Sequence, residues 1–378
     1  MTKKLKKTVI LVSANTLDRQ TRATKIIRSL NNSNFLVTYL CWDRVMKVTR
    51  SERKEAGDSF NEIKFVLKAP FGFRSVFFLP FWWCFAFVQL MINKWDAAHI
   101  CGFHSAPPVI IAGLIKRKSV VYEMIDTFAD TMQLSPFLRN FFIHIDKLLM
   151  KTSSAVILAD EGQIEEVGGI PCKNIVIIYD SPNTIFPIDT HRQINKPFII
   201  FYAGLLNSDK KLNLDKIFMA ANDIEDIKIV IAGFGDLVDM IKEWSEKIPQ
   251  KIDFIGEISH AEVLTRSAKA DLLFVLRSPL IIENKYICGS KLLESMMVGT
   301  PILVNKGTST ATKVTEEDCG IVVDSNDINE IKCAIIKLRD SPKLCENLGK
   351  NALNAHEKRY SWKIMEQRLV TLYQDLIV

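Results

Sequence analysis

The run FIIFYAG at Phe198–Gly204 is followed, after an amphipathic stretch, by a second apolar run, IKIVIAG at Ile227–Gly233. Both runs are rich in β-branched residues and end in glycine, which is typical of strands in a parallel sheet covered on both faces. The same alternation of apolar runs and amphipathic stretches continues along the chain. It predicts an α/β fold in which helices cover both faces of each sheet.

Nine further runs have this strand-like character: TVILVSA (8–14), FLVTYL (35–40), SVVY (119–122), SAVILA (154–159), NIVIIY (174–179), KIDFIG (251–256), DLLFVL (271–276), PILVN (301–305) and GIVV (320–323). The polar stretch FPIDTHRQINKP divides the runs into two series, which predicts two Rossmann-like, doubly wound parallel-sheet domains. We expect the first domain at 1–185 plus 361–378, a linker at 186–197 and the second domain at 198–360. The last segment, YSWKIMEQRLVTLYQDLIV, is expected to be a helix that packs back on the first domain.

The composition limits the classes of partner. The net charge of +6 suits anionic ligands or an acidic membrane surface, but no basic stripe is interleaved with aromatic residues, so we expect no nucleic acid partner. The 8 cysteines include no C-x-x-C pair, and none of the 6 histidines has ligand spacing to a cysteine. These patterns predict reduced, mostly buried cysteines, no zinc site and a cytoplasmic protein.

Ligands of doubly wound sheets bind beyond the carboxyl ends of the strands, so function is sought in the loops there. The segment GSKLLESMMVGTP (289–301) predicts a helix with Lys291 and Glu294 on one stripe, capped by Ser290 and ended by Gly299. A lysine beside the free N–H groups of a helix start suits an anion, and the glutamate can accept two hydroxyl hydrogen bonds, as from a ribose. The alternative is an i, i+3 surface salt bridge worth ~0.3 kcal/mol.

Three other loops of the second half carry suitable residues. The first strand there ends at Gly204 and is followed by Lys210 and Lys211, whereas the next ends in Gly233-x-Gly235, where the backbone can approach a ligand closely. The segment FIGEISHAEV (254–263) supplies backbone groups that could pair with the edge of a nucleotide base.

In this order, the segments resemble the nucleotide-binding half of retaining glycosyltransferases of family 4, which have the GT-B fold. The first half also resembles that family: QTRATKIIRSL is similar to its early helix with an arginine, and WDAAHICGFHSAPPVIIAGLIKRKSVVYEMIDTFAD to the segment with its acidic motif. The resemblance covers most of the chain. It implies two domains facing a cleft, and transfer of a hexose-type sugar from a nucleotide-diphosphate sugar to a glycan or lipid-linked acceptor, with no cofactor and no metal.

The resemblance also assigns residues. It implies catalytic roles for Asp126, Lys210 and Glu294. The donor-binding positions that it implies are Gly204, Lys210, Lys211, Gly233, Gly235, Ile255, Gly256, Ser290, Lys291, Leu292 and Glu294. The lysines would neutralise the leaving diphosphate and Glu294 would hold the ribose.

On the acceptor side, the resemblance implies Arg22, His104 and Asp126. Each also has a structural alternative. Asp126 can be a helix cap or turn former, His104 a histidine of the core, and Arg22 an exposed helix arginine.

The chain departs from the family pattern at three positions. Leu205 stands where the family has an arginine, Tyr286 where it has its first glutamate, with Glu283 near but off register, and Ile125 where many members have a histidine. Two other functions stay open: a sugar-nucleotide 2-epimerase, which shares the two-domain architecture, and a catalytically degenerate subunit that only binds the nucleotide sugar, which these departures favour.

One apolar stretch, SVFFLPFWWCFAFVQLMIN (75–93), is almost as long as the ~20 residues that a membrane span needs. Three interpretations are open: a buried helix of the first domain, a membrane span, or a helix lying in the membrane interface. The third predicts peripheral contact of residues 71–95 with an anionic membrane, at the cytoplasmic face.

Overall fold

The computed structural model describes residues 6–45, 60–70, 72–132, 134–184 and 194–377, apart from the side chains of Phe73 and Lys210. The chain divides into two compact units, Met1–Tyr179 with Met365–Val378 (unit 1) and Asp180–Ile364 (unit 2). The first division lies after Tyr179 and the second lies before Met365. The sequence analysis expects them after residue 185 and before residue 361. Most of the expected linker, 186–193, lies outside the described residues.

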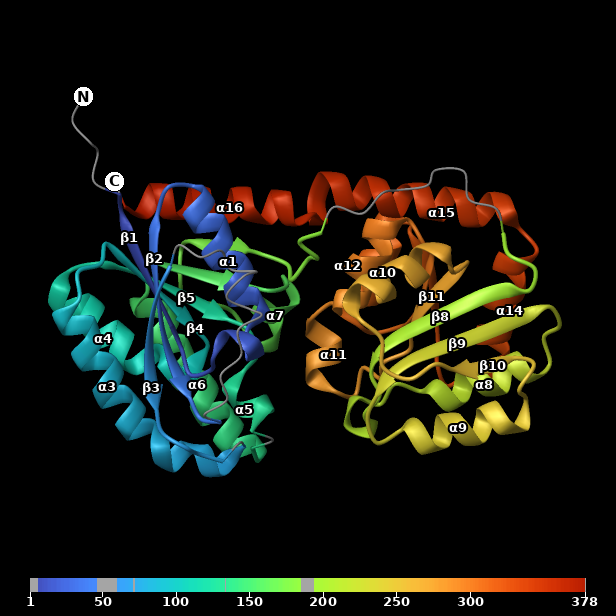
Figure 1. Cartoon of the computed structure of the whole chain (residues 1–378), viewed down its shortest axis with the longest axis horizontal. Coiled ribbons are helices and arrows are strands. Elements are labelled where there is room, and N and C mark those ends of the chain that lie inside the picture. The colour runs from blue at the N-terminus through green and yellow to red at the C-terminus, as the bar shows by residue number, and fades with distance from the viewer. Residues whose placement is uncertain (1–5, 46–59, 71, 133, 185–193, 378) are drawn as a thin grey trace. The chain divides into compact units, whose positions relative to one another are not determined.

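Unit 1 is built on a seven-stranded sheet in the order β3-β2-β1-β4-β5-β6-β7, and all of its pairings are parallel (Figure 1). The strands are β1 (Thr8–Ser13), β2 (Leu36–Asp43), β3 (Asn61–Val66), β4 (Ala97–Cys101), β5 (Ser119–Met124), β6 (Ala155–Leu158) and β7 (Ile175–Ile177). Neither β3 nor β4 is predicted from the sequence. The predicted parallel sheet is nevertheless confirmed.

The helices of unit 1 connect these strands, except for the last helix, which follows unit 2. They are η1 (Leu17–Arg19), α1 (Thr21–Asn32), η2 (Phe73–Phe78), α3 (Leu79–Ile92), η3 (Phe103–Ser105), α4 (Ala106–Lys116), α5 (Phe128–Thr131), α6 (Pro136–Thr152), α7 (Gly162–Glu166) and, after unit 2, α16 (Trp362–Leu376). As expected, the last helix packs on unit 1: the Tyr373 hydroxyl lies 2.7 Å from His99 Nδ1 of β4.

Alternate residues of the unit 1 strands face two different helix layers, as the pleat requires. Ile10, Trp42 and Tyr122 share one core cluster with side chains of α3, α4 and α6. The intervening positions carry His99 and Glu123, which contact α16 and α1 on the opposite face. Both faces of the sheet are therefore covered.

Unit 2 is built on a six-stranded parallel sheet in the order β10-β9-β8-β11-β12-β13. Its strands are β8 (Phe198–Leu205), β9 (Ile227–Phe234), β10 (Ile252–Phe254), β11 (Leu272–Val275), β12 (Ile302–Asn305) and β13 (Gly320–Val323). Its helices are η4 (Ser208–Lys210), α8 (Leu214–Asn222), α9 (Val238–Lys247), α10 (His260–Lys269), α11 (Ile282–Tyr286), α12 (Ser290–Val298), α13 (Ser309–Glu317), α14 (Ile328–Arg339), α15 (Pro342–Ala355) and η5 (His356–Tyr360).

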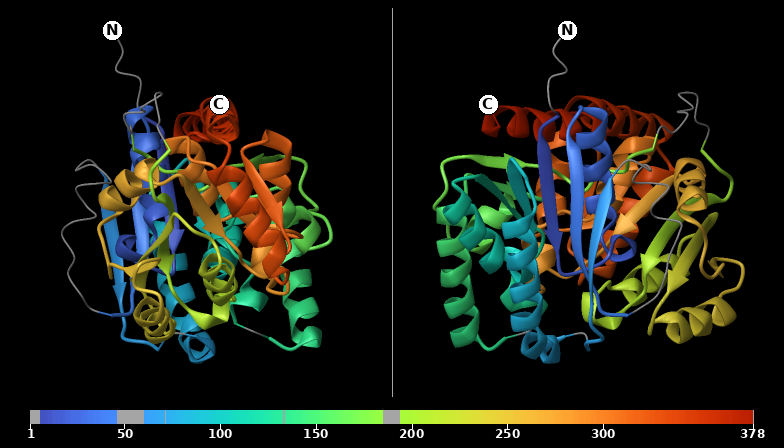
Figure 2. Two further views of the ribbon diagram at one scale, coloured as in Figure 1. Left: turned by 90° about the vertical axis from the view of Figure 1, so that its right-hand side faces the viewer. Right: turned by 60° about the vertical axis from the view of Figure 1, so that its left-hand side comes forward.

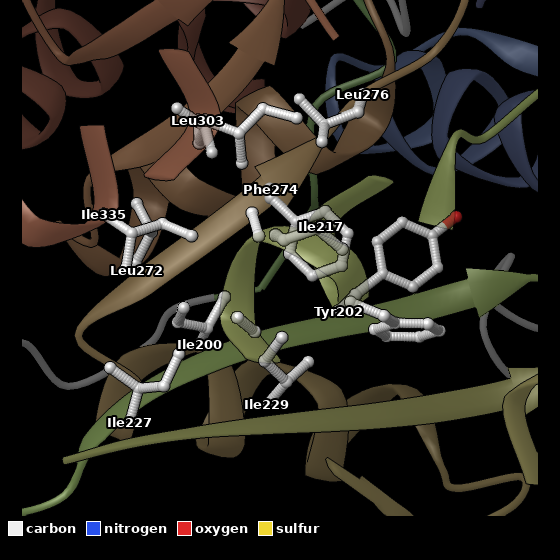
Figure 3. Close-up of a cluster of buried hydrophobic side chains, with 14 of the residues drawn as sticks. Ile200, Tyr202, Ile217, Ile227, Ile229, Leu272, Phe274, Leu276, Leu303 and Ile335 are labelled. Atoms are coloured by element: carbon white, nitrogen blue, oxygen red, sulfur yellow. The ribbon is translucent and has the colours of Figure 1, made fainter. Parts of the chain in front are cut away.

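The core of unit 2 lies between this sheet and its helices. Ile200, Ile229 and Phe274 project from three strands against Ile217 of α8 and Ile335 of α14 (Figure 3). These side chains are at most 1% exposed. Buried apolar strands thus fix the sheet and leave the loops at its carboxyl edge to form a site.

The apolar stretch at 75–93 forms the end of η2 and helix α3. By length and composition it could cross a membrane, since an 18-residue window within Arg74–Ile92 has a mean hydropathy of 1.8. Leu79, Trp82, Ala86 and Leu90 of α3 are at most 3% exposed and belong to the core of unit 1. The side of α3 that faces the sheet is therefore buried in the core of unit 1.

Candidate functional site

The carboxyl ends of β8 and β9 meet at a pair of glycines. Gly204 and Gly233 are register partners, and the Gly233 amide donates to the Gly256 carbonyl at 2.8 Å. A Cβ at Gly233 would lie 1.9 Å from the Gly204 oxygen, and one at Gly235 would lie 2.3 Å from the Leu206 oxygen. Both residues have positive φ, 138° and 147°. Contact between the two loops therefore already requires these glycines, before any ligand is considered.

Helix α12 begins at this edge, with Gly289 as its N-cap, and ends at Gly299, whose φ is 68°. The prediction for Gly299 is confirmed, but the one for Ser290 is wrong. Ser290 is the first residue inside the helix, because the chain enters with an extended Gly289 at the cap position. Residues 292–298 are all buried, Leu292 completely, since the helix packs against β11, α10 and α15.

Lys291 and Glu294 form the centre of the candidate site. Lys291 Nζ lies 2.9 Å from Glu294 Oε2, and their side chains are 21% and 6% exposed. His260 Nε2 of α10 lies 3.6 Å from the other carboxylate oxygen. A Cβ at Gly204 would lie 3.3 Å from Lys291 Cε, so the lysine stem passes directly over the end of β8.

These neighbours keep Glu294 ionised. Burial alone would raise the pKa of its carboxyl, but His260 and Lys291 outweigh burial and the pKa is lowered. The i, i+3 salt bridge that the sequence offered as an alternative is thus formed. It is mostly buried at a strand edge rather than on an open surface, and an ionised carboxylate here is a strong hydrogen-bond acceptor.

The other predicted donor positions surround this pair to different degrees. Lys211 is exposed, and its carbonyl accepts from the Ser278 amide at 3.0 Å, which joins the loops after β8 and β11. The Ile255 amide donates to Ile231, and the Gly256 carbonyl is bonded to Gly233 as above, so part of this backbone is used within the sheet. The side chain of Lys210 lies outside the described residues; its backbone ends η4.

Arg277 is a residue of this edge that the sequence analysis missed. It follows β11; its Nη1 would lie 3.8 Å from a Cβ at Gly289, the cap of α12. Its guanidinium also acts electrostatically on Tyr202, whose hydroxyl lies beside Gly204 and Lys291. Arg277 Nε is buried without a hydrogen-bond partner in the described structure. The signal in the sequence was an arginine directly after a predicted strand, in DLLFVLRSP.

The departures from the family pattern lie close by. Leu205, at the position of the family arginine, is 42% exposed at the end of β8. The Tyr286 hydroxyl in α11 accepts from Lys285 Nζ at 2.8 Å. In this chain, Arg277 and Lys291 place positive charge at an edge where the arginine at 205 is missing.

In unit 1, Arg22 is part of a buried polar network. Arg22 Nε donates to Glu123 Oε1 at 2.6 Å and its Nη2 donates to the Ile178 carbonyl at 2.7 Å. The second Glu123 oxygen lies 3.1 Å from His99 Nε2, while His99 Nδ1 contacts Tyr373. Despite its own burial, Glu123 has a pKa of about 2 because Arg22 and His99 stabilise its charge. Arg22 thus ties α1 to the sheet and is 6% exposed, rather than being an exposed helix arginine.

This network also brings His99, Cys101 and Glu123 within 4.8 Å of one another, which is a geometry suited to a metal ion. The three residues come from two neighbouring strands, so no spacing in the sequence indicates them. Burial raises the pKa of the Cys101 thiol, which keeps it protonated, and both Glu123 oxygens are bonded to Arg22 and His99. The cluster is accounted for as a buried ion-pair network.

The remaining acceptor-side residues lie at the carboxyl edge of the unit 1 sheet. His104 in η3 packs edge-on against Phe128 at 5.1 Å, and burial together with Arg44 lowers its pKa to about 4. Its imidazole is therefore neutral at pH 7. Asp126 is exposed after β5, directly before Thr127, which is the N-cap of α5, so Asp126 itself is not the cap.

Glu166 lies behind this loop and was also missed from the sequence. Its Oε1 accepts from the Thr127 hydroxyl at 3.1 Å, and its Oε2 is buried without a hydrogen-bond partner in the described structure. Burial, together with the charges of Asp130 and Asp126, raises its pKa to about 7. A protonatable carboxyl thus supports the loop that carries Asp126.

Comparison with known proteins relates this geometry to a family. Residues 188–355, which include the candidate site of unit 2, match the family model of glycosyl transferases group 1. This part of the chain is similar to glycosyl transferases group 1. The match supports a transferase enzyme, as the resemblance implies.

Curated relatives of the chain are glycosyltransferases. One, from Corynebacterium glutamicum, is a GDP-mannose-dependent monoacylated alpha-(1-6)-phosphatidylinositol monomannoside mannosyltransferase, 24% identical over 154 residues, which are 40% of this chain and 39% of the relative. Another, an uncharacterized glycosyltransferase of Methanocaldococcus jannaschii, is 24% identical over 157 residues, which are 40% of this chain and 38% of the relative. The alignments therefore span about two-fifths of each protein.

Solved structures extend the likeness in fold to nearly the whole chain. Sucrose-phosphate synthase from Thermosynechococcus elongatus matches with a TM-score of 0.72 and 13% identity over 98% of this chain and 99% of that one. Anabaena HepE, solved in complex with UDP, matches with a TM-score of 0.71 and 15% identity over 98% and 100% of the two chains. The chain thus has the GT-B fold.

Proposed function

We propose that the chain is a retaining glycosyltransferase that moves a hexose-type sugar from a nucleotide-diphosphate sugar to a glycan or lipid-linked acceptor, without a metal. The observation that carries the proposal is the Lys291–Glu294 pair, 2.9 Å apart over the end of β8, within the segment that matches glycosyl transferases group 1. Related proteins support this donor class, since HepE was solved with UDP-glucose and the Corynebacterium relative is named as GDP-mannose-dependent.

The chemistry of transfer requires cations near the leaving diphosphate. Negative charge builds on the diphosphate as the sugar bond breaks, and fixed positive groups lower that barrier. Lys291 and Arg277 supply such charge at the unit 2 edge, and Lys210 is the further candidate. Glu294, held ionised by its neighbours, is suited to accept the two ribose hydroxyls.

On the acceptor side, we propose that Asp126 contacts the acceptor or the transferred sugar. Asp126 is exposed at the carboxyl edge of the unit 1 sheet, where the neutral His104 also lies. Arg22 contributes through the fold, because its guanidinium binds Glu123 and the Ile178 carbonyl. We further propose that the protein acts in the cytoplasm, at the inner face of a membrane.

The test is a transfer assay with UDP-, GDP- and ADP-sugars and a panel of glycan and lipid-linked acceptors, in the presence of EDTA. We expect one donor to be consumed, with a product that keeps the anomeric configuration of the donor in its NMR spectrum. An inverted product would contradict retention, and activity abolished by EDTA and restored by a divalent cation would contradict metal independence.

The departures at Leu205, Tyr286 and Ile125 favour a second candidate, a subunit that binds the nucleotide sugar without turnover. Tight binding of a nucleotide sugar with neither hydrolysis nor transfer would support it. Conversion of the donor into its 2-epimer in the absence of acceptor would identify the third, an epimerase.

A further inference from the structure

Unit 1 carries an apolar surface that its own fold leaves uncovered. Of the eighteen large hydrophobic side chains that are exposed in the described part of the chain, eleven belong to η2, α3, α4 and α6. They are Phe77, Phe81, Val88, Ile92, Ile111, Leu114, Ile115, Phe137, Leu138, Phe141 and Leu148. We name the outward side of these helices the α3–α4–α6 face.

The three helices form one layer on the sheet. Helix α4 packs against both α3 and α6, and the right-hand view of Figure 2 brings this layer forward. Side chains from all three helices join the same core cluster beneath, including Trp82, Val109 and Met150. The exposed residues above them therefore belong to one continuous side of unit 1.

Helix α3 shows the pattern most clearly, because it is apolar on two opposite sides. Leu79, Trp82, Ala86 and Leu90 face the core, whereas Phe81, Val88 and Ile92 fall on the opposite stripe at 100° per residue. Phe81 and Ile92 are 61% and 68% exposed. An ordinary surface helix is polar on that side, so the outward stripe is suited to a second apolar environment.

The charges around this surface have one sign. Segments 72–94, 103–118 and 135–152 contain eight lysines and arginines and one acidic residue, Asp146. Asp146 is 3% exposed and accepts a hydrogen bond from the Tyr122 hydroxyl, and burial raises its pKa to about 7. The outward side of the three helices therefore presents only positive charge.

Most of these cations gather at one end of the layer. Each helix connects one parallel strand to the next, so the three helices run in the same direction and their C-terminal ends share an edge. Lys94, Lys116, Arg117 and Lys151 lie at or just beyond these ends, and Lys147 lies about one turn before the end of α6. Lys116 Nζ donates to the Asn93 carbonyl at 2.7 Å, which joins the ends of α3 and α4.

Two of the eight are neutralised by flanking carboxylates: Lys118 pairs with Asp96 at 3.3 Å and Arg139 with Asp130 at 2.8 Å. The other six make no ion pair with a carboxylate in the described part of the chain, and they are Arg74, Lys94, Lys116, Arg117, Lys147 and Lys151. The apolar surface is therefore bordered by six positive charges that have no carboxylate partner among the residues that the structure describes.

We propose that the α3–α4–α6 face is a docking surface for an anionic lipid bilayer. The aromatic and aliphatic side chains enter the boundary between headgroups and acyl chains, and the basic residues at the helix ends bind lipid phosphates. Helix α3 lies in the interface and does not span the bilayer, because its inner side is part of the unit 1 core. The sequence analysis offered membrane contact for residues 71–95 only, and this proposal adds α4 and α6 to the contact surface. Lipid binding at this face does not depend on whether the protein transfers a sugar.

The positive charge also distinguishes the bilayer from a second copy of the chain. Two such faces brought together would place their lysines and arginines against each other without counter-charges, which disfavours a symmetric dimer. A membrane surface rich in anionic phospholipid supplies the opposite charge.

The test is flotation with vesicles of phosphatidylcholine alone or with about 30% phosphatidylglycerol. The full chain should float with the anionic vesicles, float less with the neutral ones, and dissociate at about 0.5 M salt. The triple variant Phe81→Ser, Ile115→Ser, Phe141→Ser removes one exposed side chain from each helix. Its partitioning should fall by about tenfold or more, since apolar insertion and electrostatic attraction act together.

A matched control changes three exposed hydrophobics outside this face: Leu36→Ser, Val66→Ser and Met219→Ser, which are 45%, 54% and 40% exposed. It should float as the wild type does. Both variants should keep the wild-type circular dichroism and the wild-type stabilisation by nucleotide, which separates this test from that of the donor site. The proposal would be overturned if the triple variant floated as well as the control, or if the wild type bound neutral and anionic vesicles equally. It would also be overturned if the wild type were a dimer that the triple variant no longer formed.

Discussion

Arg277 places positive charge at an edge of unit 2 where the arginine of the family pattern is missing. The family arginine is absent at Leu205, yet a guanidinium reaches the start of α12 from the end of β11, with its Nε buried and unbonded. We predict that Arg277→Ala weakens nucleotide-diphosphate binding by about tenfold, the effect of losing one charge-assisted hydrogen bond. Titration calorimetry with UDP and GDP measures this, with Arg266→Ala on α10 as the control. Equal affinities for both variants would exclude Arg277 from the donor site.

Glu166 predicts a dependence of stability on pH. Its pKa is raised from 4.5 to about 7, chiefly by burial, so between these values the folded chain keeps a proton that the unfolded chain has lost. Stability therefore falls as pH rises through this window, by ~3 kcal/mol once both states are ionised. Glu166→Gln cannot ionise, so relative to the wild type it should gain stability between pH 4.5 and 8.

Urea denaturation followed by tryptophan fluorescence measures this, because unit 1 contains four of the six tryptophans. The exposed neighbour Glu165 provides the control, since Glu165→Gln should follow the wild-type profile. A profile of Glu166→Gln parallel to the wild type at every pH would show that this carboxyl titrates normally.

At the scale of elements, the meeting of β8 and β9 depends on the absence of side chains. A Cβ at Gly233 would lie 1.9 Å from a backbone oxygen, whereas one at Gly256, where φ is 72°, would meet nothing within 4 Å. We predict that Gly233→Ala lowers the free energy of unfolding of unit 2 by at least ~3 kcal/mol and Gly256→Ala by only ~1 kcal/mol. Urea denaturation of both variants tests this, and equal losses would mean that the loops separate easily.

The elements that the sequence predicts best are those with continuous apolar runs. All six strands of unit 2 lie in runs rich in apolar residues, because buried parallel strands need apolar side chains on both faces, although β10 also contains Asp253. Strand β3 was missed because NEIKFV at the sheet edge alternates with polar residues, and β4 because AAHIC contains one β-branched residue. Helix α12 was predicted, but its start was placed one residue late, since either Gly289 or Ser290 can occupy the cap position in the pattern.

The candidate site was predictable only in part, for a related reason. Lys291 and Glu294 are one helical turn apart, so their proximity follows from helix geometry alone. Arg277, Glu166 and the partners of Arg22 are joined by tertiary contacts between distant segments, which no local pattern reveals. For Arg22, the helix was predictable from the sequence, but the contact with the buried carboxylate of Glu123, 101 residues away, was not.

At the scale of the whole molecule, the chain leaves unit 1 after Tyr179 and returns to it at Met365. Helix α16 is held there by Tyr373, whose hydroxyl lies 2.7 Å from His99 Nδ1 in the buried network. We predict that Tyr373→Phe destabilises unit 1 by ~1–2 kcal/mol, because the His99 nitrogen loses its buried partner. Hydrogen exchange should accelerate in unit 1 peptides and stay unchanged in unit 2.

The matched control is Tyr360→Phe in unit 2, where the hydroxyl lies 3.1 Å from Glu317 Oε1. Its effect on hydrogen exchange should be confined to unit 2. Acceleration in both units by either variant would mean that the two units unfold as one.

The central claim is that the Lys291–Glu294 edge of unit 2 binds a nucleotide-diphosphate sugar. The most direct measurement is the thermal shift of the wild type and of Glu294→Gln with UDP-, GDP- and ADP-sugars, because a ligand that binds only the folded state must stabilise it. The control is Glu246→Gln, an exposed glutamate near the end of α9. We predict that at least one of these donors raises the melting temperature of the wild type and of Glu246→Gln, and that this shift is lost in Glu294→Gln. A shift that persists unchanged in Glu294→Gln, or no shift of the wild type with any of the three donors, would contradict the claim.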